Sequence, residues 1–189
     1  AVLIVSPYYN KPTQAGLYAH FAAVAAAVDV PVIVYDIPGR SIVRVNDDTL
    51  ARLASDFANI SGIKDATADL VRPTAVQNLL GNDFTQLSGE DATALPYLAA
   101  GGHGCISVTA NIAPKLLSDF QDATLNADFV KALKIQDKLT ALHDVMFIEP
   151  SPGPVSRGRH NHRHRHIAYA SASRRRSTFV ISDAGSSRR

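Results

Sequence analysis

The feature that most constrains the fold is a regular alternation of short apolar runs and amphipathic segments over about the first 112 residues. Residues 31–35 illustrate the apolar runs, because their β-branched side chains favour a strand and Pro38-Gly39 closes it. We expect five strands, at residues 1–6, at 31–35, in a run ending at 64, at 84–88 and at 104–108. Strands that alternate with helices in this way predict an α/β fold with a parallel sheet.

The segments between these runs have the spacing of helices with one apolar face. We expect Asp47 or Asp48 to cap the second helix and Gly81 to end the third. The expected helices begin near Thr13 and near Asp47 or Asp48, span 69–80 and 92–100, and cover roughly 114–121 and 128–145. The last two follow the fifth strand and predict the start of a C-terminal helical region over 113–155.

A parallel sheet of this kind is either open and doubly wound or part of a (β/α)8 TIM barrel. No GxGxxG or GxxxxGK loop follows any expected strand, which disfavours nucleotide binding. Polar and aromatic residues follow the strands instead, and in a barrel they meet at the C-terminal face, where barrel active sites lie. We therefore interpret residues 1–112 as strands 4–8 of a partial barrel. Because the chain begins within a core strand without Met, we expect a fragment that lacks the first three βα units.

Charge divides the chain unevenly. Residues 1–155 hold 10 Lys and Arg against 16 Asp and Glu, whereas residues 156–189 hold nine Arg against Asp183 alone. No apolar run is long enough to span a bilayer, and we expect no signal peptide before the first strand. The one cysteine, Cys105, excludes an internal disulfide and is expected to pack inertly in an apolar run. These features predict a cytoplasmic protein without a membrane partner.

The tail, residues 156–189, differs in composition from everything before it. It contains no Lys, Glu or Leu, and four His residues alternate with other residues from His160 to His166. A metal-binding or nucleic-acid-binding tail is one interpretation. Regular metal sites, however, need a supporting shell that this segment lacks. We favour a shifted reading frame of a GC-rich gene, with a disordered segment as the outcome, and expect no nucleic-acid partner and no metal.

Lys64 is the residue most suggestive of chemistry. It ends an apolar strand, and burial of an ammonium is costly unless its pKa falls. A neutral lysine is a good nucleophile toward a carbonyl carbon and can form a Schiff base. The alternative interpretation is a lysine at a strand end whose amine reaches water.

Other polar and aromatic residues also lie at strand exits. Tyr35 ends the second expected strand, and Arg40 follows the Pro-Gly turn after it, where it can be a surface charge. Between glycines, His103 is expected to be structural. We expect Asp91 to cap the helix that follows it.

Several ordered motifs resemble one family. They are Ser6-Pro7-Tyr8-Tyr9-Asn10-Lys11-Pro12, Tyr35-Asp36-Ile37-Pro38-Gly39-Arg40, Gly62-Ile63-Lys64-Asp65-Ala66-Thr67, Leu87-Ser88-Gly89-Glu90-Asp91, residues 101–111 and residues 147–155. Together they resemble the dihydrodipicolinate synthase (4-hydroxy-tetrahydrodipicolinate synthase) family of pyruvate-dependent class I aldolases over about residues 1–155. Asp36 and Ser41 depart mildly from the family's usual Asn and Thr.

The resemblance implies a lyase that condenses pyruvate with aspartate semialdehyde in lysine (diaminopimelate) biosynthesis. It implies that Lys64 forms the Schiff base with pyruvate without any cofactor, that Tyr35 is the general acid and base, and that Tyr9 relays protons across a dimer interface. It further implies that Arg40 grips the semialdehyde carboxylate. The remaining implied residues are Gly89 and Ile106, which line the pyruvate pocket, and Tyr8, which belongs to a lysine feedback site.

Two further expectations follow from the resemblance. A sister aldolase, such as N-acetylneuraminate lyase or a keto-sugar-acid aldolase, is the alternative, because these enzymes share the lysine and the tyrosine; Arg40 favours the synthase. The full-length protein is expected to be a homotetramer, a dimer of dimers. Because five strands cannot close an eight-stranded barrel, we expect this chain alone to be inactive or poorly folded.

Overall fold

Five parallel strands form one sheet whose order follows the sequence, β1-β2-β3-β4-β5. The computed structural model describes residues 1–161. The strands are β1 (Val2–Val5), β2 (Val32–Asp36), β3 (Ile60–Asp65), β4 (Thr85–Ser88) and β5 (Gly104–Cys105). Sequential order is that of a barrel, since a doubly wound sheet reverses its order at a switch point. The predicted partial TIM barrel is thus confirmed.

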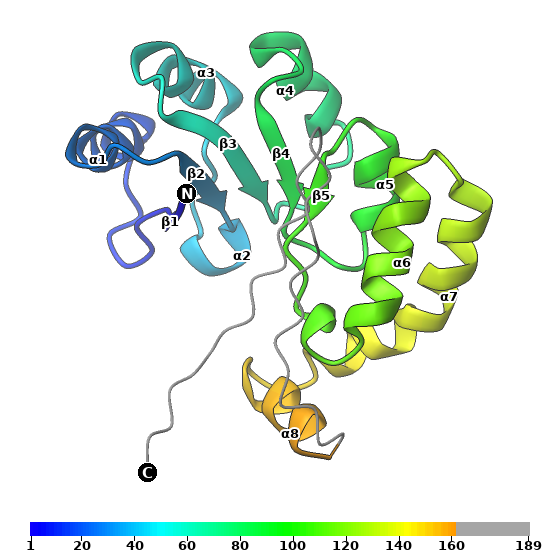
Figure 1. The fold of residues 1–189 in the computed structure, drawn as a ribbon. Coiled ribbons are helices and arrows are strands. Elements are labelled where there is room, and N and C mark those ends of the chain that lie inside the picture. Colours follow the sequence, from blue (N-terminus) through cyan, green and yellow to red (C-terminus); the bar gives the residue numbers. More distant parts are fainter. Residues whose placement is uncertain (162–189) are drawn as a thin grey trace.

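The longer helices that connect the strands lie along the outer side of the sheet (Figure 1); they are α1 (Gln14–Ala27), α3 (Asp47–Asp56), α4 (Arg72–Leu80) and α5 (Ala94–Ala99). The short α2 (Pro38–Ser41) lies instead just beyond the carboxyl end of β2. Thr13 caps α1 with its side chain, and Gly81 ends α4 with a positive φ of 78° that glycine adopts without strain. Both ends agree with the sequence pattern.

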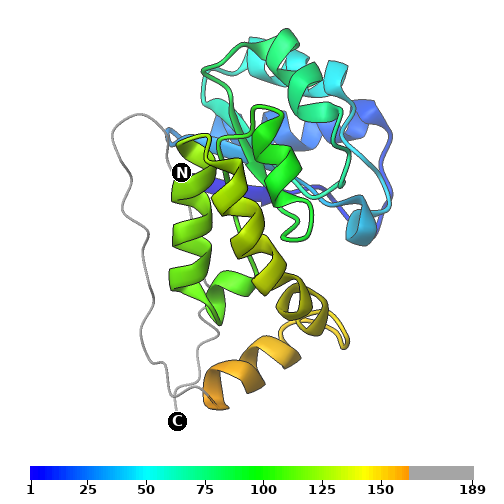
Figure 2. The same cartoon turned by 90° about the vertical axis from the view of Figure 1, so that its right-hand side faces the viewer.

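A 3₁₀ turn and three helices follow β5: η1 (Thr109–Asn111), α6 (Pro114–Leu125), α7 (Phe129–Val145) and α8 (Gly153–Asn161). Figure 2 shows α6 and α7 side by side, with α8 beyond their lower end. A hydrogen bond of 2.7 Å between Thr109 Oγ1 and His143 Nδ1 ties η1 to α7. The predicted tail starts at residue 156, and its first residues, 156–161, are helical as part of α8. The rest of the tail lies outside the described residues.

Several predicted boundaries were wrong. Asn46, not Asp47 or Asp48, occupies the N-cap of α3, and both aspartates lie in its first turn. The fifth strand stops at Cys105 instead of residue 108, because Asp91 takes the backbone N–H groups of Val108 and Thr109. α6 continues to Leu125 rather than 121, because Ala123 and Thr124 extend its buried face.

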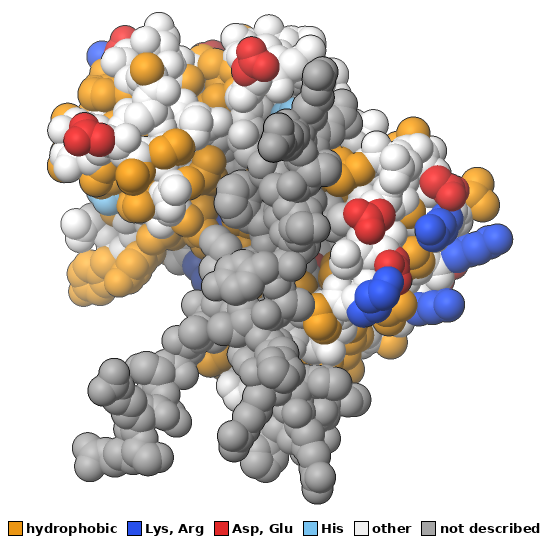
Figure 3. Space-filling view, in the orientation of Figure 1, with side chains coloured by type: hydrophobic (Ala, Val, Ile, Leu, Met, Phe, Trp, Pro, Cys, Tyr) orange, Lys and Arg blue, Asp and Glu red, His pale blue; other side chains and the backbone are white. Residues whose placement is uncertain are grey.

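Two separate groups of buried side chains form the core. The first lies between the sheet and helices α1, α3 and α4, and includes the fully buried Leu17, Phe21 and Leu50. The second joins α5, α6 and α7 around Phe120 and Leu139. None of the helices within residues 1–161 combines the length and apolar character that crossing a bilayer requires. On the face of α6 and α7 in Figure 3, basic and acidic side chains alternate, so this face presents no uniform charge.

Candidate active site

Lys64 and Tyr35 lie directly opposite each other on neighbouring strands. The register of β2 and β3 pairs these two residues, so their side chains leave the same face of the sheet. Lys64 Nζ stands 4.0 Å from the centroid of the Tyr35 ring, within the range of a cation–π contact. The Lys64 residue is only 9% exposed, whereas Tyr35 is half-buried. A nearly buried amine with a phenol beside it is an arrangement suited to carbonyl chemistry.

Gly89 provides the space that the Lys64 side chain occupies. A Cβ atom at Gly89 would lie 3.0 Å from Lys64 Cε and 3.2 Å from Lys64 Cγ, with the Ala66 Cβ at 2.9 Å. The backbone fixes this approach, because the Gly89 N–H donates to the Asp65 carbonyl at 2.6 Å. The structure therefore brings Gly89 next to Lys64. Their close approach requires a residue without a side chain at position 89.

Ile106 follows β5 and continues the pairing of the sheet. Its N–H donates to the Ser88 carbonyl at 2.8 Å, one residue before Gly89. Ile106 is buried, so its backbone lies next to the loop that carries Gly89. Lys64, Tyr35, Gly89 and Ile106 thus form a continuous group across β2 to β5, which we call the lysine cluster.

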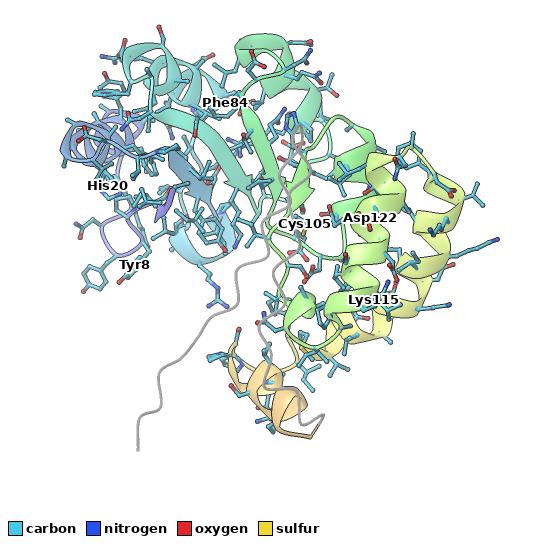
Figure 4. All side chains as sticks on the ribbon, in the orientation of Figure 1. Tyr8, His20, Phe84, Cys105, Lys115 and Asp122 are labelled. Carbon is cyan, nitrogen blue, oxygen red and sulfur yellow. The ribbon has the colours of Figure 1, made fainter. Side chains whose placement is uncertain are left out.

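The remaining predicted residues occupy loops at the same end of the sheet. Arg40 is exposed on α2, immediately after β2, and Ile42 ends that turn with a φ of 68°, a strained value for a β-branched residue. Tyr8 and Tyr9 follow β1 and are 65% and 89% exposed. Figure 4 shows the Tyr8 ring pointing away from the sheet. The chain places these three side chains in solvent rather than inside the lysine cluster.

Asp91 does not cap α5 as predicted. Its Oδ2 accepts hydrogen bonds from the N–H groups of Val108, at 2.9 Å, and Thr109, at 3.0 Å, and Thr93 is the N-cap residue of α5. The carboxylate therefore holds the segment after β5, which begins with Ile106. His103 is structural as expected, since its Nδ1 accepts the Gln86 N–H at 3.0 Å.

Arg72 is a residue that the sequence pattern did not single out. Its side chain is fully buried, and its guanidinium donates to Asp36 at 2.6 Å, to Asp47 at 2.8 Å and to the Val45 carbonyl at 2.7 Å. Burial opposes its charge, but Asp65 and Asp36 hold the pKa of Arg72 above its usual value. Burial raises the pKa of Asp36 despite the guanidinium. The available sequence signal for a buried cation was the pair of aspartates at strand ends, Asp36 directly after Tyr35 and Asp65 directly after Lys64.

Cys105 is buried beside the lysine cluster. Burial raises the pKa of its thiol well above the usual value, and Asp91 raises it further. Cys105 is 1% exposed and packs in the second core, in agreement with the expectation that it is a packing residue. Within residues 1–161, His, Cys, Asp and Glu side chains form no group of three or more that could hold a metal ion. The histidine run from His160 to His166 lies outside the side chains that the structure describes.

Comparison with known proteins points to one family. A sequence profile described as the "Dihydrodipicolinate synthetase family" matches residues 1–162. A protein of Afipia carboxidovorans named 4-hydroxy-tetrahydrodipicolinate synthase is 60% identical over 155 residues, which are 82% of this chain and 52% of that protein.

Solved structures give the same result. A crystal structure of dihydrodipicolinate synthase from Acinetobacter baumannii, chloride inhibited and complexed with pyruvate, has a TM-score of 0.80 and 45% identity, covering 84% of this chain and 54% of that one. The enzyme from Aquifex aeolicus has a TM-score of 0.81 and 43% identity, covering 83% and 54%. The chain therefore spans about half the length of the relatives that it matches.

Proposed function

The chain belongs to the dihydrodipicolinate synthetase family, and from this premise we propose that it carries the pyruvate-binding lysine of a synthase that condenses pyruvate with aspartate semialdehyde. The observation that carries the proposal is the contact between Lys64 Nζ and the Tyr35 ring at a nearly buried position. The related A. baumannii structure is described as a complex with pyruvate, which supports the choice of first substrate.

Lys64 performs the covalent step. Its amine adds to the ketone carbon of pyruvate and water leaves, so that a C=N bond replaces the C=O bond. The iminium withdraws electrons from the adjacent methyl group, which loses a proton to give an enamine. The enamine carbon then forms a bond to the aldehyde carbon of the semialdehyde, whose C=O π bond breaks as its oxygen takes up a proton, and the C=N bond to Lys64 forms again. Water then hydrolyses this bond and returns the free amine. This chemistry needs no cofactor, because the lysine itself supplies the electron sink.

Tyr35 moves the protons of these steps. Its ring lies against the Lys64 amine, so its hydroxyl is close to the atoms that gain and lose protons. A phenol with an ordinary pKa near 10 needs a relay to work at neutral pH. We assign one relay position to Tyr9, whose 89% exposure suits a side chain that acts in the site of a second copy.

Two backbone positions and one cation complete the substrate contacts. Gly89 and Ile106 border Lys64 with peptide groups, which suits recognition of the pyruvate carboxylate and methyl group. Arg40 is exposed at the same end of the sheet, and its planar guanidinium suits a bidentate contact with the semialdehyde carboxylate. Tyr8, exposed beside Tyr9, is assigned to a lysine feedback site.

The assembly and setting are part of the same proposal. We propose a homotetramer for the full-length protein and a cytoplasmic location. The sister aldolases that share a lysine and a tyrosine are less well supported, because the relatives compared above are named as synthases. A coupled assay on the full-length protein with aspartate semialdehyde and with sialic acid separates the two activities.

Borohydride reduction in the presence of pyruvate tests the central step. We expect a stable reduced adduct that mass spectrometry of peptides locates at Lys64 and not at the exposed Lys115. Lys64→Arg keeps the charge and should abolish the adduct, whereas Lys115→Arg should leave it unchanged. Tyr35→Phe should slow adduct formation by about 100-fold.

The same measurement also decides whether the chain alone is inactive, as its strand count led us to expect. The described residues bury two cores and bring the lysine cluster together, so we propose that the first half of the reaction proceeds in the chain as it is. An adduct at Lys64 overturns the expectation of inactivity. The absence of an adduct in this chain agrees with the expectation of inactivity, whereas labelling of many lysines to equal extent, or no adduct at Lys64 in the full-length protein, contradicts the proposed role of Lys64.

A further inference from the structure

Within residues 1–161, Arg72 is the largest fully buried side chain, and its guanidinium contacts residues outside its own helix. It begins α4, yet its guanidinium contacts the end of β2 through Asp36, the start of α3 through Asp47, and the preceding loop through the Val45 carbonyl. Its NH1 also stands 3.6 Å from Asp65 Oδ1 at the end of β3. One planar group therefore joins two strands and two helices.

The two strand aspartates have a particular relation to the lysine cluster. Asp36 directly follows Tyr35, Asp65 directly follows Lys64, and both pairs are opposite each other in the register of β2 and β3. Because successive side chains of a strand point to opposite faces, the aspartates lie behind the sheet when Tyr35 and Lys64 lie in front of it. Arg72 thus bridges the two strands one residue away from the reacting pair.

We propose that Arg72 is a positioning residue, whose guanidinium clamps the carboxyl ends of β2 and β3 from behind and so holds the Lys64 amine against the Tyr35 ring. The inference rests on the proposed function in one respect, that Lys64 and Tyr35 are the reacting pair. The requirement for arginine follows from geometry: a guanidinium offers five N–H donors in one plane, whereas a lysine amine at this position reaches fewer partners.

The clamp also sets the charge near Lys64. In front of the sheet, Lys64 Nζ faces the Tyr35 ring. Behind the sheet, the Arg72 cation balances Asp36 and Asp65. Without that cation the two carboxylates would act on Lys64 uncompensated, and nearby negative charge favours an ammonium over a neutral amine.

Competitive acetylation of the full chain with acetic anhydride tests the proposal without using pyruvate. Peptide mass spectrometry measures the extent of labelling at Lys64 relative to the exposed Lys115 across a range of pH. The pH at which Lys64 labelling reaches half its maximum, here called the half-reactive pH, reports the charge around Lys64. The ratio of Lys64 labelling to Lys115 labelling at high pH, here called the labelling ratio, reports how tightly the Lys64 amine is held. Circular dichroism at the same temperature restricts the comparison to folded variants.

Three variants and one control carry the expected results. Arg72→Gln should move the half-reactive pH of Lys64 upward by about one unit and raise its high-pH labelling ratio several-fold. Arg72→Lys keeps the positive charge but loses the planar set of N–H donors. It should therefore raise the high-pH labelling ratio of Lys64 and leave the half-reactive pH near that of the wild type. Asp36→Asn should raise the ratio less. The control Arg44→Gln removes a guanidinium that contacts Asp47 and Asp69 at the surface, and should change neither value.

A purely structural Arg72 would lower the denaturation midpoint and leave both Lys64 values unchanged in the folded variants, and that result would overturn the proposal. If Arg72→Gln does not fold, Arg72→Lys and Asp36→Asn decide the question by the same ratio. Failure of pyruvate trapping in the wild type would count against the proposed function alone, because acetylation reports on Arg72 independently.

Discussion

At the scale of single residues, Gly89 is the position where one added methyl group should have the most specific effect. Its missing Cβ leaves space for the Lys64 side chain, and Gly89→Ala would bring a methyl group within 3.0 Å of Lys64 Cε. We expect the variant to fold and to form the pyruvate adduct about 100-fold more slowly, since misplacement of a reacting group by about 1 Å has effects of this size. Timed borohydride trapping measures the rate.

Gly39→Ala is the matched control. A Cβ atom at Gly39 would meet nothing within 4 Å, although the residue precedes Arg40 and lies near the same end of the sheet. Adduct formation in this variant should equal that of the wild type. Equal rates in Gly89→Ala and Gly39→Ala would show that Lys64 does not need the space at Gly89.

Cys105 gives a prediction about pH. Burial raises the pKa of its thiol in the folded chain, so the contribution of this residue to stability is complete below the unfolded-state pKa of about 8.5. That contribution declines as the pH rises from there toward the folded-state pKa. The difference in free energy of unfolding between wild type and Cys105→Ala should therefore shrink by about 1 kcal/mol between pH ~7.5 and pH ~9.5. Urea denaturation at the two pH values measures it, and a constant difference would contradict the prediction.

At the scale of elements, Asp91 determines where β5 ends and how the next segment runs. Its buried carboxylate accepts two backbone N–H groups, so Asp91→Ala leaves both donors without their acceptor. We expect a loss of about 2–4 kcal/mol in the free energy of unfolding, and a smaller loss for Asp91→Asn, which keeps one acceptor oxygen. Urea denaturation measures both.

Asp122→Ala serves as the comparison, since Asp122 is exposed on α6 and points into solvent (Figure 4). Its removal should change stability by less than about 0.5 kcal/mol. Similar losses in Asp91→Ala and Asp122→Ala would mean that the two backbone hydrogen bonds of Asp91 contribute little.

The elements could be predicted where the signal is local. The β-branched run of β2 and the end of α4 at Gly81 follow from residue type, and both were predicted correctly. Asp91 was assigned to the wrong partner because an aspartate before a helix has the pattern of a cap, whereas its actual partners are 17 and 18 residues away. Arg72 was missed for the same reason: it pairs with Asp36, 36 residues distant, and no local spacing encodes that contact.

At the scale of the whole molecule, the strands that carry the lysine cluster pack against two separate cores. One core is built by the sheet and the helices α1, α3 and α4, and the other by α5, α6 and α7. β4 and β5 connect them, together with contacts such as the hydrogen bond of 3.4 Å that Thr74 Oγ1 on α4 donates to the carbonyl of Ala100 at the end of α5. Few polar links of this kind suggest that each core can open without the other.

Phe21 and Phe120 allow this independence to be tested with one substitution in each core. Both side chains are fully buried, so Phe→Ala at either position should cost about 3–5 kcal/mol. In hydrogen–deuterium exchange, Phe120→Ala should speed exchange mainly in α5, α6 and α7, whereas Phe21→Ala should do so in β1, β2 and α1. Because the strands that carry Tyr35 and Lys64, β2 and β3, pack against the first core through Val34 and Ile63, pyruvate trapping should fall much more in Phe21→Ala. Uniform acceleration across all helices in both variants would instead indicate a single cooperative unit, in which the lysine cluster depends equally on both cores.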